Sequence, residues 1–243
     1  NVAVGFKSLF SNVGAGIQNI AIGACSLYGQ AGNCSYKNIG IGFNAGKQIT
    51  TGTDNTFIGN GAGVNITTGK FNQIIGSALS GVAGAAGEAL TTGCCNVALG
   101  NGALKLTTTS NSNTAVGTIA MAANTTGTAN TAVGALALDA NTTANNNTAV
   151  GNLSATGNTT GTNNSALGFQ SFVTNTTGSG NVAIGVNSLY ANTTASNNVS
   201  IGLSALEANT TGACNTAVGT EALKANTTSG NNTEFGYKAL FTQ

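Results

Sequence analysis

The chain has 243 residues, of which 5% are charged, with a formal net charge of +1 and no His, Pro or Trp. The near-zero charge excludes a basic surface that would neutralise phosphates, so nucleic-acid binding is not expected. Without histidine, Ser-His-Asp triads and histidine-centred metal sites are excluded as well. The hydrophobic content of 41%, placed at regular spacing, argues against disorder.

The sequence contains no candidate membrane span. No apolar run approaches the roughly 20 residues that are needed to cross a bilayer, so membrane insertion is not expected. No signal peptide is visible, and the chain starts with Asn1 instead of Met. This start is typical of a processed or partial chain whose targeting segment lies outside the sequence.

The motif Asn-x-Ala-(Val or Ile)-Gly recurs along the chain and divides it into coils. The coils begin at Asn1, Asn19, Asn38, Asn55, Asn72, Asn96, Asn113, Asn130, Asn147, Asn164, Asn181, Asn198, Asn215 and Asn232. Repeats of this kind are the signature of a solenoid. The spacing predicts one solenoid domain over 1–243, with irregular coils over 1–95, an insertion near 77–90 and regular 17-residue coils over 96–243.

The composition of the repeat favours strands over helices. Helical solenoids use longer units, typically above about 30 residues, and Gly, Asn and Thr are poor helix formers. Two strands of about four residues, joined at Gly and Asn corners, fit each coil. We therefore predict an all-β fold, a parallel β-solenoid (β-roll or β-helix) of about fourteen coils of ~17 residues, stacked ~4.8 Å apart as a rod roughly 65–70 Å long.

The positions within a coil predict its interior. Position four is always apolar and position nine is mostly large and apolar, so both are expected to fill the interior as ladders. The Asn at position one is expected to stack on its equivalents as an amide ladder, because a buried amide is tolerated when its partners are supplied. The clearest members of that ladder are Asn113, Asn130, Asn147, Asn164, Asn181, Asn198 and Asn215.

Glycine and small residues mark three further columns. Position five is Gly in every coil, which indicates a corner with φ > 0 or a close backbone approach. Positions three and eight are mostly Ala or Ser, as in Ala132 and Ala137. Two interpretations stay open: an outer stripe against which a neighbouring chain packs, or a lining for a tight corner of the same coil.

The few charged residues do not form a catalytic pattern. Glu207 and Lys224 share position ten of successive coils, and Glu221 and Lys238 share position seven, which predicts surface ion pairs one coil apart. The carboxylates are not paired at any repeated offset, and the repeat lacks the Asp of calcium-binding solenoids. We expect no enzymatic activity, no metal site and no cofactor.

Five cysteines bear on redox state and assembly. The sequence contains no C-x-x-C pair, so it does not indicate a zinc site. Cys25 and Cys34 lie in one irregular coil, which makes them candidates for a disulfide. Because the total is odd, one thiol is left over, and the isolated Cys214 is the candidate for an inter-chain bond; the alternative is an unpaired Cys buried in a corner.

Asn-Thr-Thr recurs once per coil over the regular region and fits the acceptor pattern for N-glycosylation. The candidate acceptors are Asn124, Asn141, Asn158, Asn175, Asn192, Asn209 and Asn226. Glycans along one edge would make the chain a glycoprotein and offset its low charge. The alternative is that Asn-Thr-Thr forms a corner, since Asn tolerates the left-handed conformation.

The unit N-T-A-V-G-x-x-A-L-x-x-N-T-T-G, clearest from Asn113 to Gly236, resembles repeats of bacterial surface proteins and viral tail-fibre-like proteins. It is also similar to the shorter A-I-G-x-x-A repeats in the heads of trimeric autotransporter adhesins. That resemblance implies a left-handed parallel β-roll and a trimer that binds host matrix or neighbouring cells.

These observations predict a structural protein whose partner is itself. We expect a subunit of an extracellular filament, surface fibre or virion fibre that assembles by head-to-tail or lateral packing of solenoids. The alternative is an adhesin head or tail-fibre domain, expected to be a trimer, that binds a host or cell-surface receptor or glycan. A minor alternative is an ice-binding solenoid, although Thr125 and Thr126 are adjacent and would face opposite ways.

Overall fold

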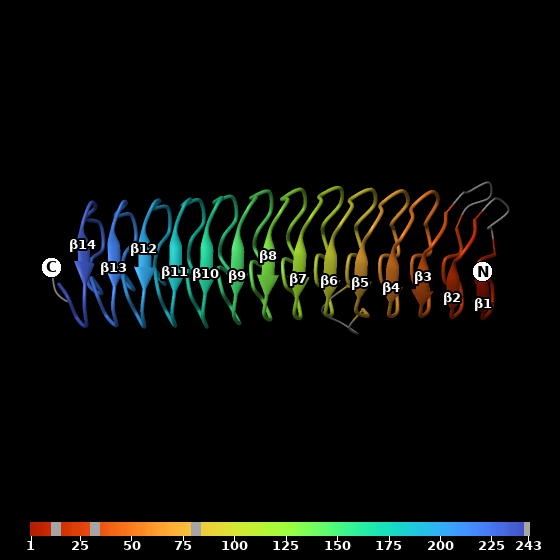
Figure 1. Ribbon diagram of the computed structural model, residues 1–243, viewed down its shortest axis with the longest axis horizontal. Helices are drawn as coiled ribbons and strands as arrows, with labels where there is room; N and C mark the ends of the chain where they lie inside the picture. Colours follow the sequence, from red (N-terminus) through yellow and green to blue (C-terminus); the bar gives the residue numbers. More distant parts are fainter. Residues whose placement is uncertain (11–15, 30–34, 79–83, 241–243) are drawn as a thin grey trace. The chain divides into compact units, whose positions relative to one another are not determined.

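The computed structural model describes residues 1–10, 16–29, 35–78 and 84–240. It divides into two compact units, 1–126 and 127–243, and the expected single domain over 1–243 stays a prediction. Within the described residues all regular structure is β, as predicted. Each unit is a parallel β-solenoid, and its strands are labelled in Figure 1.

The described residues of the first unit contain seven strands, each paired in parallel with the next along the chain. They are β1 (Val2–Val4), β2 (Ile20–Ile22), β3 (Ile39–Ile41), β4 (Thr56–Ile58), β5 (Gln73–Ile75), β6 (Val97–Leu99) and β7 (Thr114–Val116). The expected insertion near 77–90 lies between β5 and β6, and residues 79–83 of it are outside the described residues.

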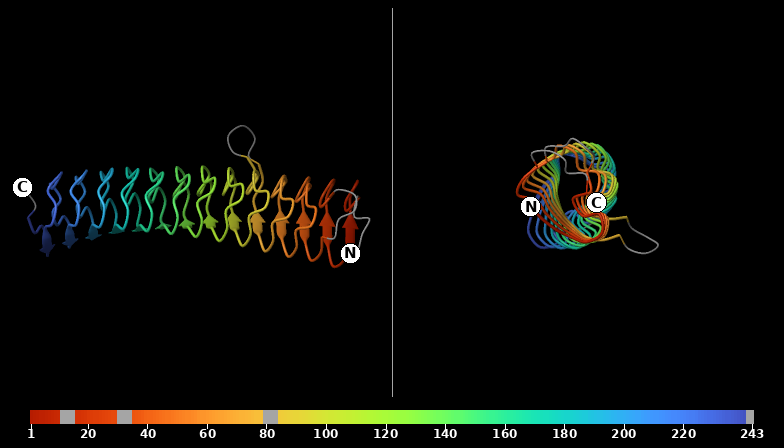
Figure 2. Two further views of the ribbon diagram at one scale, coloured as in Figure 1. Left: turned by 90° about the horizontal axis from the view of Figure 1, so that it is seen from above. Right: turned by 90° about the vertical axis from the view of Figure 1, so that its right-hand side faces the viewer.

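The second unit, as far as residue 240, contains seven more strands in the same arrangement. They are β8 (Thr131–Val133), β9 (Thr148–Val150), β10 (Ser165–Leu167), β11 (Val182–Ile184), β12 (Val199–Ile201), β13 (Thr216–Val218) and β14 (Thr233–Phe235). The register follows the repeat, since Ala166 lies opposite Ala149 on one side and Ala183 on the other. In Figure 2 the strand arrows of this unit follow one edge of the stacked coils.

Each coil has one strand of three residues in the described parts of the chain, so the prediction of two strands per coil is wrong. Turns take the place of the second strand. At positions seven and nine non-glycine residues have positive φ, for example Asn187 (56°) and Leu189 (51°). These turns are held by bonds between coils: the Leu189 N–H donates to the Ala205 carbonyl at 3.0 Å.

The interior differs from the prediction at one position. Position nine is buried, as expected, with Leu138, Leu189 and Leu206 fully enclosed. Position four is not: Val133, Leu167 and Ile184 are exposed, whereas their neighbours at position three are buried. Side chains alternate along a strand, so the Ala at position three shares the inward direction of the Asn at position one.

The small residues at positions three and eight therefore line the interior. Ala132, Ala137, Ala149 and Ala183 are all buried. Of the two interpretations that the sequence left open, the structure supports the lining, and the outward face of the strand is formed by other residues.

Candidate functional site

The outward face of the strands in the second unit carries large apolar side chains. Leu167 (49% exposed) comes from position four, and Phe169 (47%) and Leu203 (50%) come from position six. Ile184 and Val186 lie in the coil between them and are also exposed. We call these five residues the apolar stripe.

The apolar stripe is two parallel rows, one residue from each coil. In the row at position four, Leu167 lies opposite Ile184 in the β10–β11 register. In the row at position six, the Ser204 N–H donates to the Val186 carbonyl at 2.9 Å, and the Asn187 N–H donates to the Phe169 carbonyl at 3.3 Å. The glycines at position five lie between the rows and carry no side chain.

The first unit has an outward face of the same kind. Val4 and Phe6, Ile22, and Ile41 with Phe43 are exposed at positions four and six of its first three coils. None of the fourteen coils has an Asp, Glu or Lys at position two, four or six. The outward strand face is therefore uncharged, and its apolar side chains lie among Thr, Ser, Asn and Gln.

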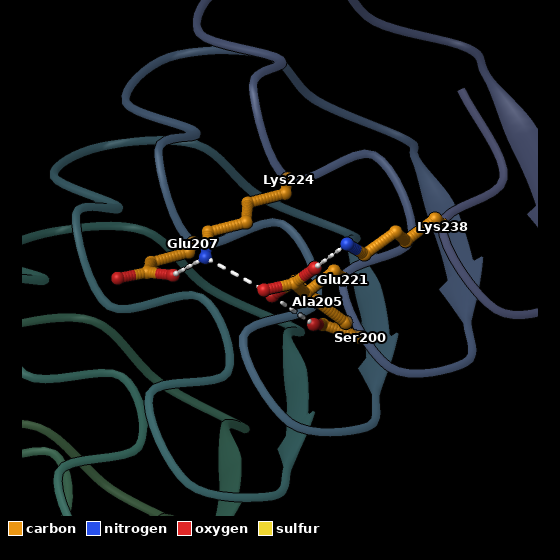
Figure 3. A network of polar contacts seen from close by, with 6 residues as sticks. All are labelled: Ser200, Ala205, Glu207, Glu221, Lys224 and Lys238. Atoms are coloured by element: carbon orange, nitrogen blue, oxygen red, sulfur yellow. Dashed lines mark hydrogen bonds and ion pairs between the residues drawn. The ribbon is translucent and has the colours of Figure 1, made fainter. Parts of the chain in front are cut away.

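Charges gather instead in a ladder at positions seven and ten of the last coils (Figure 3). Lys224 Nζ lies 3.3 Å from Glu207 Oε2 and 3.0 Å from Glu221 Oε1, and Lys238 Nζ lies 3.3 Å from Glu221 Oε2. The two predicted pairs are confirmed, and the Lys224–Glu221 contact links them. The hydrogen bond from Lys224 lowers the pKa of Glu221, and the bonds to Glu221 and Glu207 raise the pKa of Lys224.

The Asn residues at position one lie in a buried column. In the second unit, each N–H from Asn147 to Asn215 donates to the Oδ1 of the Asn one coil earlier, at 2.8–3.0 Å. In the first unit the Asn113 N–H donates to Asn96 Oδ1 at 3.0 Å. Each side chain also closes its own coil, as where Asn164 Nδ2 donates to the Gly178 carbonyl at 2.9 Å.

The Asn residues of the Asn-Thr-Thr motifs form a second buried column. In the second unit Asn158 Nδ2 donates to Asn141 Oδ1 at 3.1 Å, and the pattern continues at 2.7–3.1 Å through Asn175, Asn192, Asn209 and Asn226. In the first unit Asn124 is buried, and its Nδ2 donates to Thr107 Oγ1. The carbonyl of Gly161 accepts from both columns, from Asn147 and from Asn158.

This burial argues against the predicted glycosylation. A glycan would be attached to the Nδ2 atoms that donate these bonds, and it would have to enter a closed interior. The structure therefore favours the corner role for the seven acceptors. The recurrence of Asn at two positions per coil was the signal in the sequence for a second ladder. The match to the glycosylation acceptor pattern suggested instead that these Asn side chains are exposed.

The cysteines are not brought together where the structure describes them. Cys25 is half-buried, and its expected partner Cys34 lies outside the described residues, so that disulfide stays a prediction. Cys94 is half-buried, and Cys95 is exposed. Cys214 is exposed and not buried in a corner. An inter-chain disulfide would require such exposure, and that bond stays a prediction.

The described residues contain no group of three or more His, Cys, Asp or Glu side chains that would hold a metal ion. In the same part of the chain, no helix has the length and hydrophobicity of a membrane span. A small open hollow in the first unit is lined by Tyr28, Gly29, Lys47 and Gln48.

Comparison with known proteins finds no matching family model, no similar curated protein and no similar solved structure. The resemblance to adhesin-head repeats therefore extends only to the parallel β-solenoid that the structure shows.

Proposed function

We propose that the chain is a structural subunit of an extracellular or cell-surface fibre, with no catalytic role. The observation that supports this function is the coil-to-coil bonding of the interior. Each regular coil of the second unit is joined to the next by strand pairing and by bonds from two asparagine columns, in the same pattern from coil to coil. A stack bonded at every repeat resists extension along its axis, which is what a fibre element requires.

The partner in this proposal is another copy of the chain, joined head-to-tail, laterally or both. Exposed strand edges favour pairing with further strands, and a contiguous exposed apolar patch is typical of an interaction site. Electron microscopy of native, undenatured material tests the proposal. Fibres longer than one chain are expected, and dispersed single particles at all concentrations would contradict it.

An adhesin head is the second candidate, because the uncharged stripe would also suit a protein receptor. This function predicts a discrete trimer of fixed length instead of a continuous fibre. Sedimentation equilibrium separates the two: a single trimer mass that does not grow with concentration favours the adhesin head, and continued growth favours the fibre.

The ice-binding alternative receives no support from the threonines of the second unit. In the Thr pairs from Thr142 to Thr211, the first hydroxyl bonds to the next coil, as where Thr159 Oγ1 donates to the Thr176 carbonyl at 2.9 Å. The second Thr of these pairs, such as Thr160 or Thr194, is exposed. Measurement of thermal hysteresis in a concentrated sample is expected to show none.

A further inference from the structure

The outward strand face of the second unit exposes more apolar surface than isolated surface residues would. Scattered exposed apolar side chains are ordinary, but here position four is apolar in every coil of the unit, and position six is apolar except at Asn152 and Thr220. Eight residues at positions four and six are exposed: Val133, Leu167, Phe169, Ile184, Val186, Leu203, Phe235 and Tyr237. No charged residue interrupts these rows.

The exposed area is of the size that a stable interface needs. A half-exposed large apolar residue presents about 70–100 Å² of accessible surface, so the five residues of the apolar stripe present roughly 350–500 Å², and all eight exposed residues of the face roughly 600–800 Å². A standard protein–protein interface buries about 800 Å² on each partner. The face of this one unit therefore approaches a full interface without any contribution from the first unit.

The repeat determines which partner fits. The rows have one residue per coil, at the ~4.8 Å spacing of paired strands, on either side of a side-chain-free glycine column. A partner with the same axial repeat makes the same contact at every coil, whereas a partner without it matches at only a few. Interdigitated rows at this spacing are how stacked β-structures pack face to face. The partner that carries both the spacing and the uncharged face is a second copy of this chain.

We propose that two copies of the chain associate laterally, with the apolar stripe of the second unit packed against the same stripe of its partner. This inference rests on the proposed structural function and names the surface through which that function is exercised. The two-fold pairing of one surface with itself is the commonest form of self-association.

Sedimentation velocity of the full chain over the micromolar range tests this surface. The test variant is Phe169→Lys with Leu203→Lys, which puts two like charges into the row at position six. The matched control is Thr177→Lys with Thr211→Lys, which adds the same charge at exposed sites of the same two coils. We expect wild type and control to self-associate and the stripe variant to associate at least tenfold more weakly.

A second variant tests whether a loss of association by the lysine variant results from misfolding. Phe169→Thr with Leu203→Thr places at position six the residue that Thr220 already provides there. It should keep the circular dichroism spectrum of the wild type and still lose association. A wild-type chain that stays monomeric, or stripe variants that associate as the wild type does, would overturn the inference. So would a monomeric wild-type chain that uses the stripe to bind a cell-surface protein.

Electron microscopy separates this inference from the proposed function. If native material and the stripe variant both form fibres, the fibre function stands and the stripe is not the interface. If the chain dimerises through the stripe but native material contains no fibres, the interface stands and the fibre function fails.

Discussion

The glycine at position five combines two constraints at one residue. Its φ lies between +125° and +155° in every coil, a region that side-chain-bearing residues rarely adopt. A Cβ at Gly168 would also lie 2.7 Å from the carbonyl oxygen of Gly185 in the next coil. The backbone conformation and the close approach of adjacent coils therefore both require glycine there.

We predict that Gly168→Ala destabilises the second unit by about 2–4 kcal/mol, because backbone strain and the clash act together. Gly236→Ala is the control: its φ is +126°, but no atom lies within 4 Å of the added Cβ. It should shift the urea midpoint less than Gly168→Ala does. Equal shifts would show that the close approach contributes nothing.

Burial distinguishes two leucines in the coil that contains β12. Leu206 at position nine is fully buried, whereas Leu203 at position six is half-exposed. Leu206→Ala should cost about 2–5 kcal/mol, from lost apolar burial and the cavity left behind. Leu203→Ala should cost less than about 1 kcal/mol in the same chemical denaturation experiment. The reverse order would mean that the inward and outward faces are misassigned.

At the scale of the element, the asparagine columns set the geometry of each coil. An Asn side chain suits the column because it supplies an acceptor for the next coil and a donor for its own. Asn181 shows both: its Oδ1 accepts from the Asn198 N–H at 3.0 Å, and its Nδ2 donates to the Ala195 carbonyl at 2.9 Å. A residue with only one of these functions leaves a buried polar group without a partner.

Asn181→Asp should therefore destabilise the fold by about 2–4 kcal/mol at neutral pH, because an ionised carboxylate faces the Ala195 carbonyl in a closed interior. Burial raises the pKa of such a carboxyl in the folded state. Stability should then recover as the pH falls from about 7 to about 4, where the protonated acid can donate again. Thermal melts at several pH values check this, with Asn181→Ala as a control that shows no such recovery.

The charge ladder acts between neighbouring coils at the surface. The hydrogen bond with Lys224 is the main cause that lowers the pKa of Glu221. The contribution of Glu221 to folding stability is therefore present above the ordinary carboxylate pKa and is lost as the pH falls through the lowered pKa. The raised pKa of Lys224 gives the opposite dependence, with a contribution lost only at strongly alkaline pH. Glu221→Gln should lower the melting temperature by a few degrees at most at neutral pH. That difference should shrink in acid and in high salt.

For the molecule as a whole, the uncharged strand face and the buried acceptors determine what the surface offers to a partner. Glycans on the Asn-Thr-Thr motifs would project from the fold only if the acceptor side chains left the interior. We therefore predict that the intact mass of the native protein shows no glycan on Asn158, Asn175 or Asn192, which are all fully buried. Peptide mapping after glycosidase treatment checks this, and occupied sites would show that the second column does not form.

The spacing of Asn, Gly and Leu was enough to predict the all-β solenoid, its coil boundaries and the buried role of position nine. These predictions rested on local chemistry, because few other residues can replace Gly where two backbones approach closely or Asn in a hydrogen-bonded ladder. The same alternation that placed Asn181 inward also implied that Ala183 points inward and Ile184 outward. Hydrophobicity alone suggested the opposite for Ile184.

The sequence by itself determined that similar coils repeat and which residues recur at each position of the coil. Only the tertiary structure decided that the described part of each coil has one strand, that leucines such as Leu189 take a left-handed conformation, and that the acceptor asparagines turn inward. The physical reason is that these choices depend on hydrogen bonds from one coil to the next. A single coil supplies none of those partners, so its local preferences could not reveal them.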